Sequence, residues 1–359
     1  MEMKRLLLLV LALMPMTAFG QKASELKYVD GRELMLINQG FDNTEIYYSR
    51  LPEDMKSATR DEVWSLGLNS AGLALRFSSD SKTLAARWTL LNDFHMTHMA
   101  GTGIRGIDLY VLGDDHNWHF VSTVQPRGKE CENVFVRNME GRMRDYMVYL
   151  PLYDGVEKVE IGVDSTAVIG GPKDRALTKK GKPIVFYGTS ITQGGCASRP
   201  GMVYTSIISR ELDKECINLG FSGNARMDKS MAEIVSRIDG EQYVIDCLPN
   251  CTTQMLRDSA WYFMTYLLEA HPDVPVYMVE NVMFSYTIVD VTSRNELIEK
   301  NAYWHDLYKR LRKEGYRNLK YIPTKGLTGP DYEGSVDGAH QTDLGFLRMA
   351  GTFLKHLTK

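Results

Sequence analysis

The sequence lacks the features that mark disulfide scaffolds and nucleic-acid binders. Its 359 residues contain only five cysteines, an odd number at scattered positions, so no disulfide framework can be read from them. The formal net charge is −3, and no block of lysine and arginine is present that could neutralise a run of phosphates. Nucleic acid is therefore excluded as the expected partner.

Long apolar runs are also scarce. Residues 6–14 form an unbroken apolar stretch that follows Lys4 and Arg5, and small residues at positions 18 and 20 suit a signal peptidase. No later run approaches the ~20 apolar residues that cross a bilayer. Residues 1–20 are therefore expected to be a signal peptide. The mature chain would begin at Gln21, be exported to the periplasm or the medium, and show no stable membrane insertion after signal removal.

The few cysteines are expected to be buried free thiols. Cys247 and Cys251 are four residues apart, but neither a second such pair nor a nearby histidine accompanies them, which argues against zinc. An exported compartment permits disulfides, and the sequence leaves any pairing open. We expect neither a metal nor a cofactor. The five positions are Cys131, Cys196, Cys216, Cys247 and Cys251.

About 340 mature residues exceed the usual size of one core, so two domains are expected. From about residue 28 to 165 the chain shows short runs rich in β-branched and aromatic residues, separated by turn signals. This pattern predicts an all-β jelly roll or sandwich over residues 21–175. A polar stretch with glycine and proline, residues 170–183, is read as the linker. The predicted strands are residues 73–79, 84–91, 106–112, 118–124, 145–153 and 156–164.

From residue 183 the pattern changes to apolar strands that alternate with amphipathic stretches. Near-continuous apolar strands are typical of a sheet covered by helices on both faces. Residues 176–359 are therefore predicted to form a doubly wound α/β domain with about five parallel strands. The predicted helices are residues 204–212, 231–238, 254–270, 293–314 and 344–357.

Polar residues follow several of these strands, and the carboxyl ends of parallel strands meet at one sheet edge. Ser190 follows the first strand, and Asp337 and His340 precede the last helix. A serine hydroxyl needs an adjacent base, which His340 can supply, and Asp337 can orient that histidine. The amides of Ser190 and Gly223 and the side chain of Asn250 could donate hydrogen bonds to an oxyanion.

The blocks "GTSITQG", "GFSGNA", "PN" and "DGAH" resemble those of the SGNH (GDSL-type) hydrolases, and "GIRGIDLYVL" resembles the GxDLY-type β-domain of one bacterial branch. The resemblance implies a flavodoxin-like hydrolase domain that cleaves esters, often acetyl groups on carbohydrates, without a cofactor. It implies Ser190 as nucleophile, Asp337 and His340 as the acid–base pair, and Gly223 and Asn250 as oxyanion donors. Leu248 stands where the family has glycine, and Gln341 stands where proline is common.

Other residues permit two interpretations each. His95 and His98 could hold a metal, but they lie in a segment, residues 92–103, that either helps to wall the pocket or is a plain loop. Arg199 and Arg226 could contact a substrate or be ordinary surface arginines. Asn218 and Asn224 are given no role. Three tryptophans form either a sugar platform or core, the latter being more common: Trp64, Trp88 and Trp118.

The sequence therefore predicts an exported serine esterase that removes short acyl groups, acetyl first among them, from carbohydrate. Two alternatives remain open at this point. One is a lipase or thioesterase for longer acyl chains, against which the absence of a long apolar lid argues. The other is a carbohydrate-binding protein with an inert hydrolase domain. The serine, histidine and aspartate positions are all filled, which favours an enzyme over the second alternative.

Overall fold

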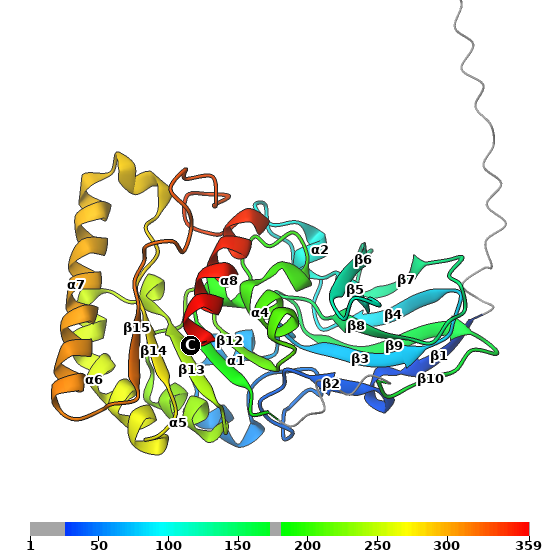
Figure 1. Cartoon of the computed structure of the whole chain (residues 1–359), viewed down its shortest axis with the longest axis horizontal. Helices are drawn as coiled ribbons and strands as arrows, with labels where there is room; N and C mark the ends of the chain where they lie inside the picture. The colour runs from blue at the N-terminus through cyan, green and yellow to red at the C-terminus, as the bar shows by residue number, and fades with distance from the viewer. Residues whose placement is uncertain (1–25, 173–180, 359) are drawn as a thin grey trace, which may run out of the picture.

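The computed structural model describes residues 26–172 and 181–358, which form two antiparallel sheets and one parallel sheet (Figure 1). The predicted signal peptide and most of the predicted linker lie outside the described residues. Within these two ranges, no helix is both long enough and apolar enough to cross a membrane.

The N-terminal part is built from two antiparallel sheets. The first has the order β1-β9-β4-β7, and the second has the order β10-β3-β8-β5-β6 with β2 also paired to β3. The strands of the first sheet are β1 (Leu26–Asp30), β9 (Val156–Asp164), β4 (Leu84–Leu90) and β7 (Glu130–Val136). Those of the second are β10 (Ile169–Gly170), β3 (Ala74–Ser79), β8 (Arg144–Tyr149), β5 (Ile107–Leu112), β6 (Trp118–Val124) and β2 (Met35–Ile37).

One apolar core joins these two sheets. Alternate residues of β9, such as Val159 and Ile161, and alternate residues of β3, Leu75 and Phe77, belong to the same buried cluster. Because side chains alternate across a strand, each sheet presents one apolar face to the other. The predicted β-domain is confirmed as two antiparallel sheets around one core, and its jelly-roll connectivity stays a prediction.

The C-terminal part contains a parallel sheet of the order β12-β11-β13-β14-β15, the 2-1-3-4-5 arrangement of flavodoxin-like folds. Helices α4 and α8 cover one face, and α5, α6 and α7 cover the other. The strands are β11 (Ile184–Gly188), β12 (Cys216–Gly220), β13 (Gln242–Asp246), β14 (Val276–Val279) and β15 (Leu319–Ile322). The helices are α4 (Tyr204–Leu212), α5 (Lys229–Arg237), α6 (Thr253–Ala270), α7 (Val291–Lys313) and α8 (Asp343–Leu357).

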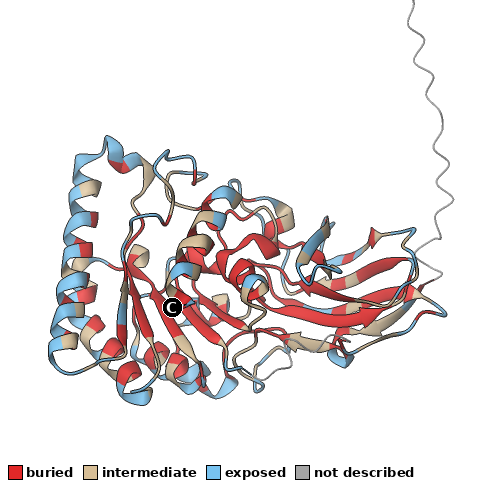
Figure 2. Cartoon of the chain, in the orientation of Figure 1, coloured by how far each residue is buried: buried red, intermediate tan, exposed pale blue. Residues whose placement is uncertain are grey.

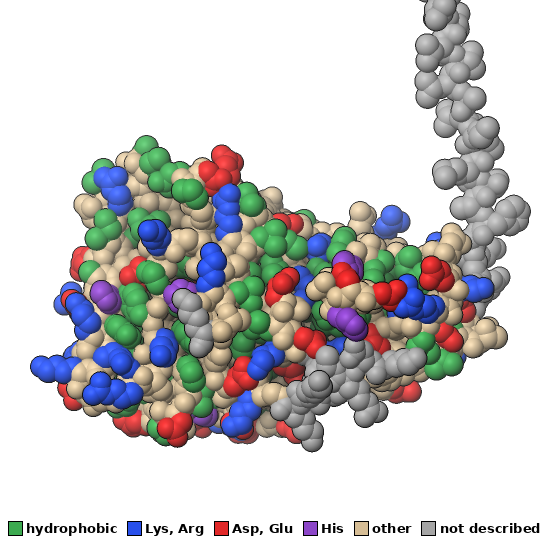
Figure 3. All heavy atoms as spheres, in the orientation of Figure 1, with side chains coloured by type: hydrophobic (Ala, Val, Ile, Leu, Met, Phe, Trp, Pro, Cys, Tyr) green, Lys and Arg blue, Asp and Glu red, His purple; other side chains and the backbone are tan. Residues whose placement is uncertain are grey.

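Burial explains why these strands read as apolar runs. Every residue of β11, β12 and β14 is buried, whereas α7 exposes one long face (Figure 2). The predicted doubly wound α/β domain is confirmed. On the face shown in Figure 3, acidic and basic side chains are interspersed over both parts of the molecule.

One segment of the β-rich region packs on the C-terminal part. It contains the 3₁₀ helix η3 (Glu53–Ala58) and the helix α1 (Asp61–Gly67), and the sequence pattern did not predict either. Met55, Val63 and Trp64 belong to the core cluster of α5 and α6. The two parts therefore share a core as well as a surface.

A buried pair of charges from the "GIDLY" motif joins the same two parts. Asp108 on β5 is fully buried, accepts a hydrogen bond from the Gly201 amide, and lies 2.9 Å from Nη1 of Arg199. The Arg199 guanidinium also stacks 3.7 Å above the Phe120 ring. The interpretation of Arg199 as a substrate contact was wrong, because its charge already binds the β-domain.

Arg50 makes a second polar junction with a buried guanidinium. It donates hydrogen bonds to the carbonyl oxygens of Leu66 and Asn69 in the N-terminal part, and of Asn218 and Gly220 at the end of β12. Burial lowers the pKa of Arg50 to about 9. The four hydrogen bonds that Arg50 donates offset part of the cost of burying this charge.

We expect Arg50→Lys to lower the free energy of unfolding by roughly 2–4 kcal/mol, because one ammonium cannot reach four carbonyls spread over two domains. Chemical denaturation followed by circular dichroism measures this. Arg257→Lys is the matched control, because Arg257 is exposed, and it should change stability by less than about 0.5 kcal/mol. Equal stability of the two variants would contradict the assigned role of Arg50.

Candidate active site

Ser190 lies at the carboxyl end of β11, as the first residue of the short helix α3 (Ser190–Gln193). Thr189 caps this helix by accepting a hydrogen bond from the Ile191 amide at 3.2 Å. A Cβ added to Gly188 would lie 1.9 Å from Oγ1 of Thr192, so only glycine permits this tight strand-to-helix turn. The local sequence thus holds Ser190 at the sheet edge with 7% of its surface exposed.

The structure brings Ser190, His340 and Asp337 into one hydrogen-bonded chain. Oγ of Ser190 lies 2.9 Å from Nε2 of His340, and Nδ1 of His340 lies 2.7 Å from Oδ2 of Asp337. The contact between Ser190 and His340 joins residues that are 150 positions apart. A hydroxyl, a base and a group that orients the base are therefore linked in space by two hydrogen bonds.

The Asp337 carboxylate is fixed by several donors. Its Oδ1 accepts hydrogen bonds from the amides of Ala339 at 3.0 Å and His340 at 2.8 Å. Partial burial raises the pKa of Asp337, but the hydrogen bonds from the His340 ring and from the two amides outweigh it and lower the pKa to about 2. The carboxylate is therefore charged at neutral pH and can stabilise an imidazolium.

Gln341 does not loosen the loop that carries these two residues. It is buried, and its side-chain amide donates to the carbonyl of Ala339 at 2.9 Å. The loop is also tied by the Val336 amide, which donates to the His340 carbonyl at 2.8 Å, and by the Ser285 amide, which donates to the Gly338 carbonyl at 2.7 Å. These bonds hold the loop where the family commonly has proline.

The oxyanion candidates lie on two neighbouring loops. Gly223 has a φ of 70°, and a Cβ added there would meet no atom within 4 Å. Oδ1 of Asn250 accepts a hydrogen bond from the Ala225 amide at 3.2 Å. This bond orients the side-chain amide, and its NH₂ group has no hydrogen-bond partner among the described residues. An available donor is what an oxyanion site requires.

Two positioning residues were not predicted from the sequence. Gln193 donates to the carbonyl of Leu152 and accepts from the amide of Ser222, so it links the serine helix to the β-domain and to the Gly223 loop. The hydroxyl of Tyr153 donates to the Ser190 carbonyl at 3.3 Å. Gln193 lies in the "GTSITQG" block, but that block drew attention only to Ser190, and Tyr153 lies in none of the quoted blocks.

The segment of residues 92–103 lies against the catalytic part, as one of its two interpretations proposed. The His98 ring is 5.7 Å from the His340 ring, and the Thr102 hydroxyl donates to the Ser198 carbonyl at 2.6 Å. His95 instead contacts Arg105, at 3.3 Å. His95 and His98 therefore contact different partners, and they do not form the common metal site that the metal interpretation required.

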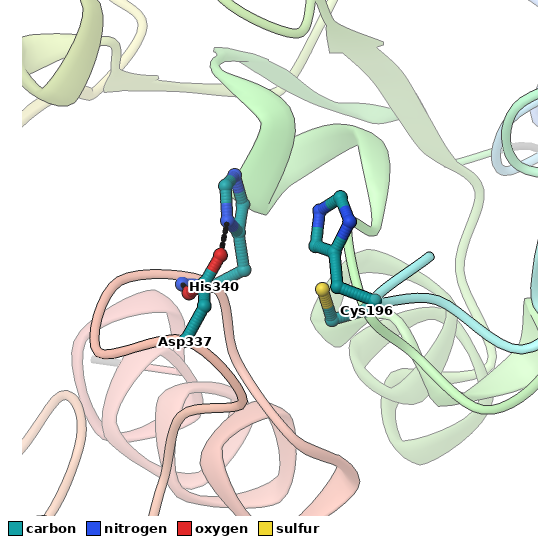
Figure 4. Close-up of side chains that lie close together, drawn as sticks. Cys196, Asp337 and His340 are labelled. Carbon is teal, nitrogen blue, oxygen red and sulfur yellow. Dashed lines mark hydrogen bonds and ion pairs between the residues drawn. The ribbon is translucent and has the colours of Figure 1, made fainter. Parts of the chain in front are cut away.

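A second grouping around His340 could in principle hold a metal. Ligand atoms of His98, Cys196, Asp337 and His340 lie within 4.8 Å of one another. Figure 4 shows the Asp337 carboxylate bonded to His340, with the Cys196 sulfur apart from that bond. Burial and the Asp337 charge raise the pKa of Cys196 to about 12, so its thiol keeps its proton at neutral pH. The group fits a hydrogen-bonded triad better than a metal centre.

The remaining cysteines and the tryptophans are structural. All five cysteines are free and buried, as expected. The Trp64 and Trp88 side chains lie in apolar cores, and Trp118 packs at the edge of another, so the sugar-platform interpretation was wrong. Arg226 is exposed and its Nε donates to the Gly223 carbonyl at 3.1 Å. Its role toward a substrate stays a prediction.

Asp246 is a buried carboxyl at the end of β13, beneath the serine helix. The Tyr204 hydroxyl lies 3.0 Å from Oδ2 of Asp246 and 2.9 Å from Oγ1 of Thr192. Burial raises the pKa of Asp246 to about 7, although hydrogen bonds from Tyr204 and Thr192 oppose this. The folded protein therefore resists ionisation of this carboxyl, whereas the unfolded chain does not.

Because the folded pKa of Asp246 is raised, its contribution to stability is fully present below about pH 4 and is lost as the pH rises through about 7. Asparagine has the same shape and no charge to lose. We subtract the melting temperature of the parent from that of Asp246→Asn at each pH. We expect this difference to be larger at pH 8 than at pH 5, by on the order of 5 °C. Calorimetry at both pH values measures this, and an identical difference at both would contradict it.

A parallel 2-1-3-4-5 sheet, preceded by a β-domain and carrying its polar residues at the strand ends, defines an α/β hydrolase of the SGNH type. Residues 181–358 match the family model of the GDSL-like lipase/acylhydrolase family. Residues 26–169 match the GxDLY model, the N-terminus of SGNH-hydrolase-type esterases. The chain belongs to this family and is a carboxylic ester hydrolase.

Solved structures agree with this assignment. A Bacteroides ovatus protein assigned as a GDSL-like lipase is 33% identical, with a TM-score of 0.88 over 93% of this chain and 97% of that one. The fold also resembles a salicylyl-acyltransferase from a tetracycline biosynthetic pathway (14% identity, TM-score 0.72, 94% and 98% covered). A family two carbohydrate esterase from Clostridium thermocellum, solved with cellohexaose, is more distant (11%, 0.57, 80% and 92%). No curated protein matches significantly.

Proposed function

We propose that this protein is an exported serine esterase that hydrolyses short acyl esters, acetyl first among them, on carbohydrates. The observation that carries the proposal is the chain of contacts from Ser190 through His340 to Asp337, with distances of 2.9 and 2.7 Å. Export is inferred from the N-terminal sequence, which has a basic start and a short apolar stretch.

The proposed reaction has two halves. In the first, Ser190 attacks the ester carbonyl carbon while Nε2 of His340 takes the hydroxyl proton, and the C–O bond to the alcohol breaks as His340 returns that proton to the leaving oxygen. In the second, water gives a proton to His340 and attacks the acyl-enzyme. The acid then leaves, and Ser190 regains its proton. Asp337 stays ionised and stabilises the imidazolium throughout.

Two observations support the proposed substrate. A structural relative suggests the carbohydrate, and the lack of an evident lid suggests a short acyl group. The Clostridium thermocellum esterase, whose fold this chain shares, was solved with a cellulose oligosaccharide. The sequence offers no evident long apolar lid, which favours small acyl groups over fatty acids. Lipase activity on longer chains is the remaining alternative.

We expect the purified protein to hydrolyse aryl acetate at least about tenfold more efficiently than the matched aryl octanoate, as judged by kcat/KM. It should also release acetate from acetylated oligosaccharides. Spectrophotometry measures the first reaction and acetate release the second. Faster cleavage of octanoate would favour the lipase alternative, and no cleavage of any ester would contradict the proposed function.

A further inference from the structure

A cavity of 670 Å³ lies between the β-domain and the "GFSGNA" block of the hydrolase part. Phe94 and Asn69 line it from the N-terminal part, together with Glu62 of α1. Ser222 and Asn224 line it from the hydrolase part. None of these five residues belongs to the hydrogen-bonded chain of Ser190, His340 and Asp337, and no sequence motif assigned any of them a function.

The cavity adjoins the candidate catalytic groups. Ser222 and Asn224 flank Gly223, the candidate oxyanion donor. Tyr153, which also lines the cavity, donates its hydroxyl hydrogen bond to the carbonyl of Ser190 at 3.3 Å. A Cβ added to Gly195 would lie 2.9 Å from the Tyr153 hydroxyl and 3.1 Å from Cδ2 of His340, so both side chains pack against Gly195.

The lining combines one aromatic surface with hydrogen-bonding groups. Phe94 is 47% exposed although it is a large apolar side chain. The Asn69 side chain has no hydrogen-bond partner among the described residues, and the Glu62 carboxylate makes only a 3.5 Å ion pair with Arg60. An aromatic face beside an amide and an exposed carboxylate that is only weakly paired suits a sugar ring, which offers an apolar C–H face and hydroxyl donors.

We propose that this cavity is the subsite for the sugar that carries the ester, a role that rests on the proposed esterase function. Phe94 stacks on the ring, and Asn69 and Glu62 accept hydrogen bonds from its hydroxyls. The carboxylate of Glu62 repels a substrate carboxylate, so the subsite prefers an uncharged sugar to a uronic acid. The β-domain thereby supplies the specificity of the enzyme.

The test compares two acetate esters that differ only in the alcohol. Ethyl acetate presents the acyl group with an alcohol too small to fill the cavity, and a monoacetylated neutral oligosaccharide presents it on a sugar. We expect Phe94→Ala to lower kcat/KM for the oligosaccharide about tenfold, mainly through KM, and to leave ethyl acetate within about twofold. Tyr262→Ala, an exposed aromatic on α6, is the matched control and should change neither.

A second variant tests the charge. Glu62→Gln should reduce the preference for the neutral oligosaccharide over an acetylated uronate oligosaccharide about threefold or more. Equal losses on ethyl acetate and oligosaccharide in Phe94→Ala, or no loss on either, would overturn the subsite. A parent enzyme that cleaves neither ester would instead refute the esterase function itself, and the subsite with it.

Discussion

Ser190→Ala should lower kcat for aryl acetate by at least about 10³-fold. The reason is that, among the described residues, Ser190 supplies the one hydroxyl that hydrogen-bonds to Nε2 of His340, so the variant has no nucleophile for the base to activate. The residual rate would come from the oxyanion donors acting on water. The melting temperature should stay within about 2 °C, because the hydroxyl makes a single side-chain contact at the pocket.

The control for Ser190→Ala is a comparison with His340→Ala and with the double variant, which tests whether the two residues act together. His340→Ala alone and the double variant Ser190→Ala/His340→Ala should each lose about as much activity as Ser190→Ala, since either loss ends nucleophilic catalysis. Losses that multiply in the double variant would show that the two residues act separately. A Ser190→Ala enzyme as active as the parent would contradict the proposed mechanism.

Asn250→Ala should lower kcat by about 10²–10³-fold, because the Ala225 amide orients its side chain and we expect the remaining NH₂ group to donate to the oxyanion formed at Ser190. Stabilisation of a developing oxyanion acts in the transition state and less in the bound substrate, so KM should change little. Steady-state kinetics with aryl acetate measure both parameters.

Asn250→Asp separates catalysis from structure. Aspartate keeps the oxygen that accepts the Ala225 hydrogen bond, but it replaces the NH₂ donor with an anion. If Asn250 only holds the loop, Asn250→Asp should keep most of the activity. We expect it to lose at least as much activity as Asn250→Ala while its melting temperature stays closer to that of the parent.

Much of the fold of both parts follows from local sequence patterns. The predicted helix over residues 204–212 coincides with α4, and the predicted strands over 118–124 and 156–164 coincide with β6 and β9. These elements have strong periodicity or continuous apolar runs, which are local properties of the chain. The residues now proposed as catalytic were found because their motifs lie at strand ends that must meet at one edge.

The contacts between the two parts could not be predicted in the same way. Arg50 binds carbonyls about 170 residues away, and Asp108 binds Arg199 across 91 positions. Contacts between residues so far apart leave no periodic pattern of apolar residues in the sequence. The helix α1 is short, and its apolar residues pack in the hydrolase core and not on the sheets of the β-domain. The surrounding sequence has the pattern of β structure, so the helix was not predicted.

The central claim is that Ser190 is a nucleophile activated by His340. The most direct measurement is labelling of the purified protein with a fluorophosphonate, followed by mass spectrometry of the intact protein and its peptides. We expect one adduct per chain, located on Ser190 and absent from Ser190→Ala. An unlabelled parent protein, or an adduct on any other residue, would show that Ser190 is not the activated nucleophile.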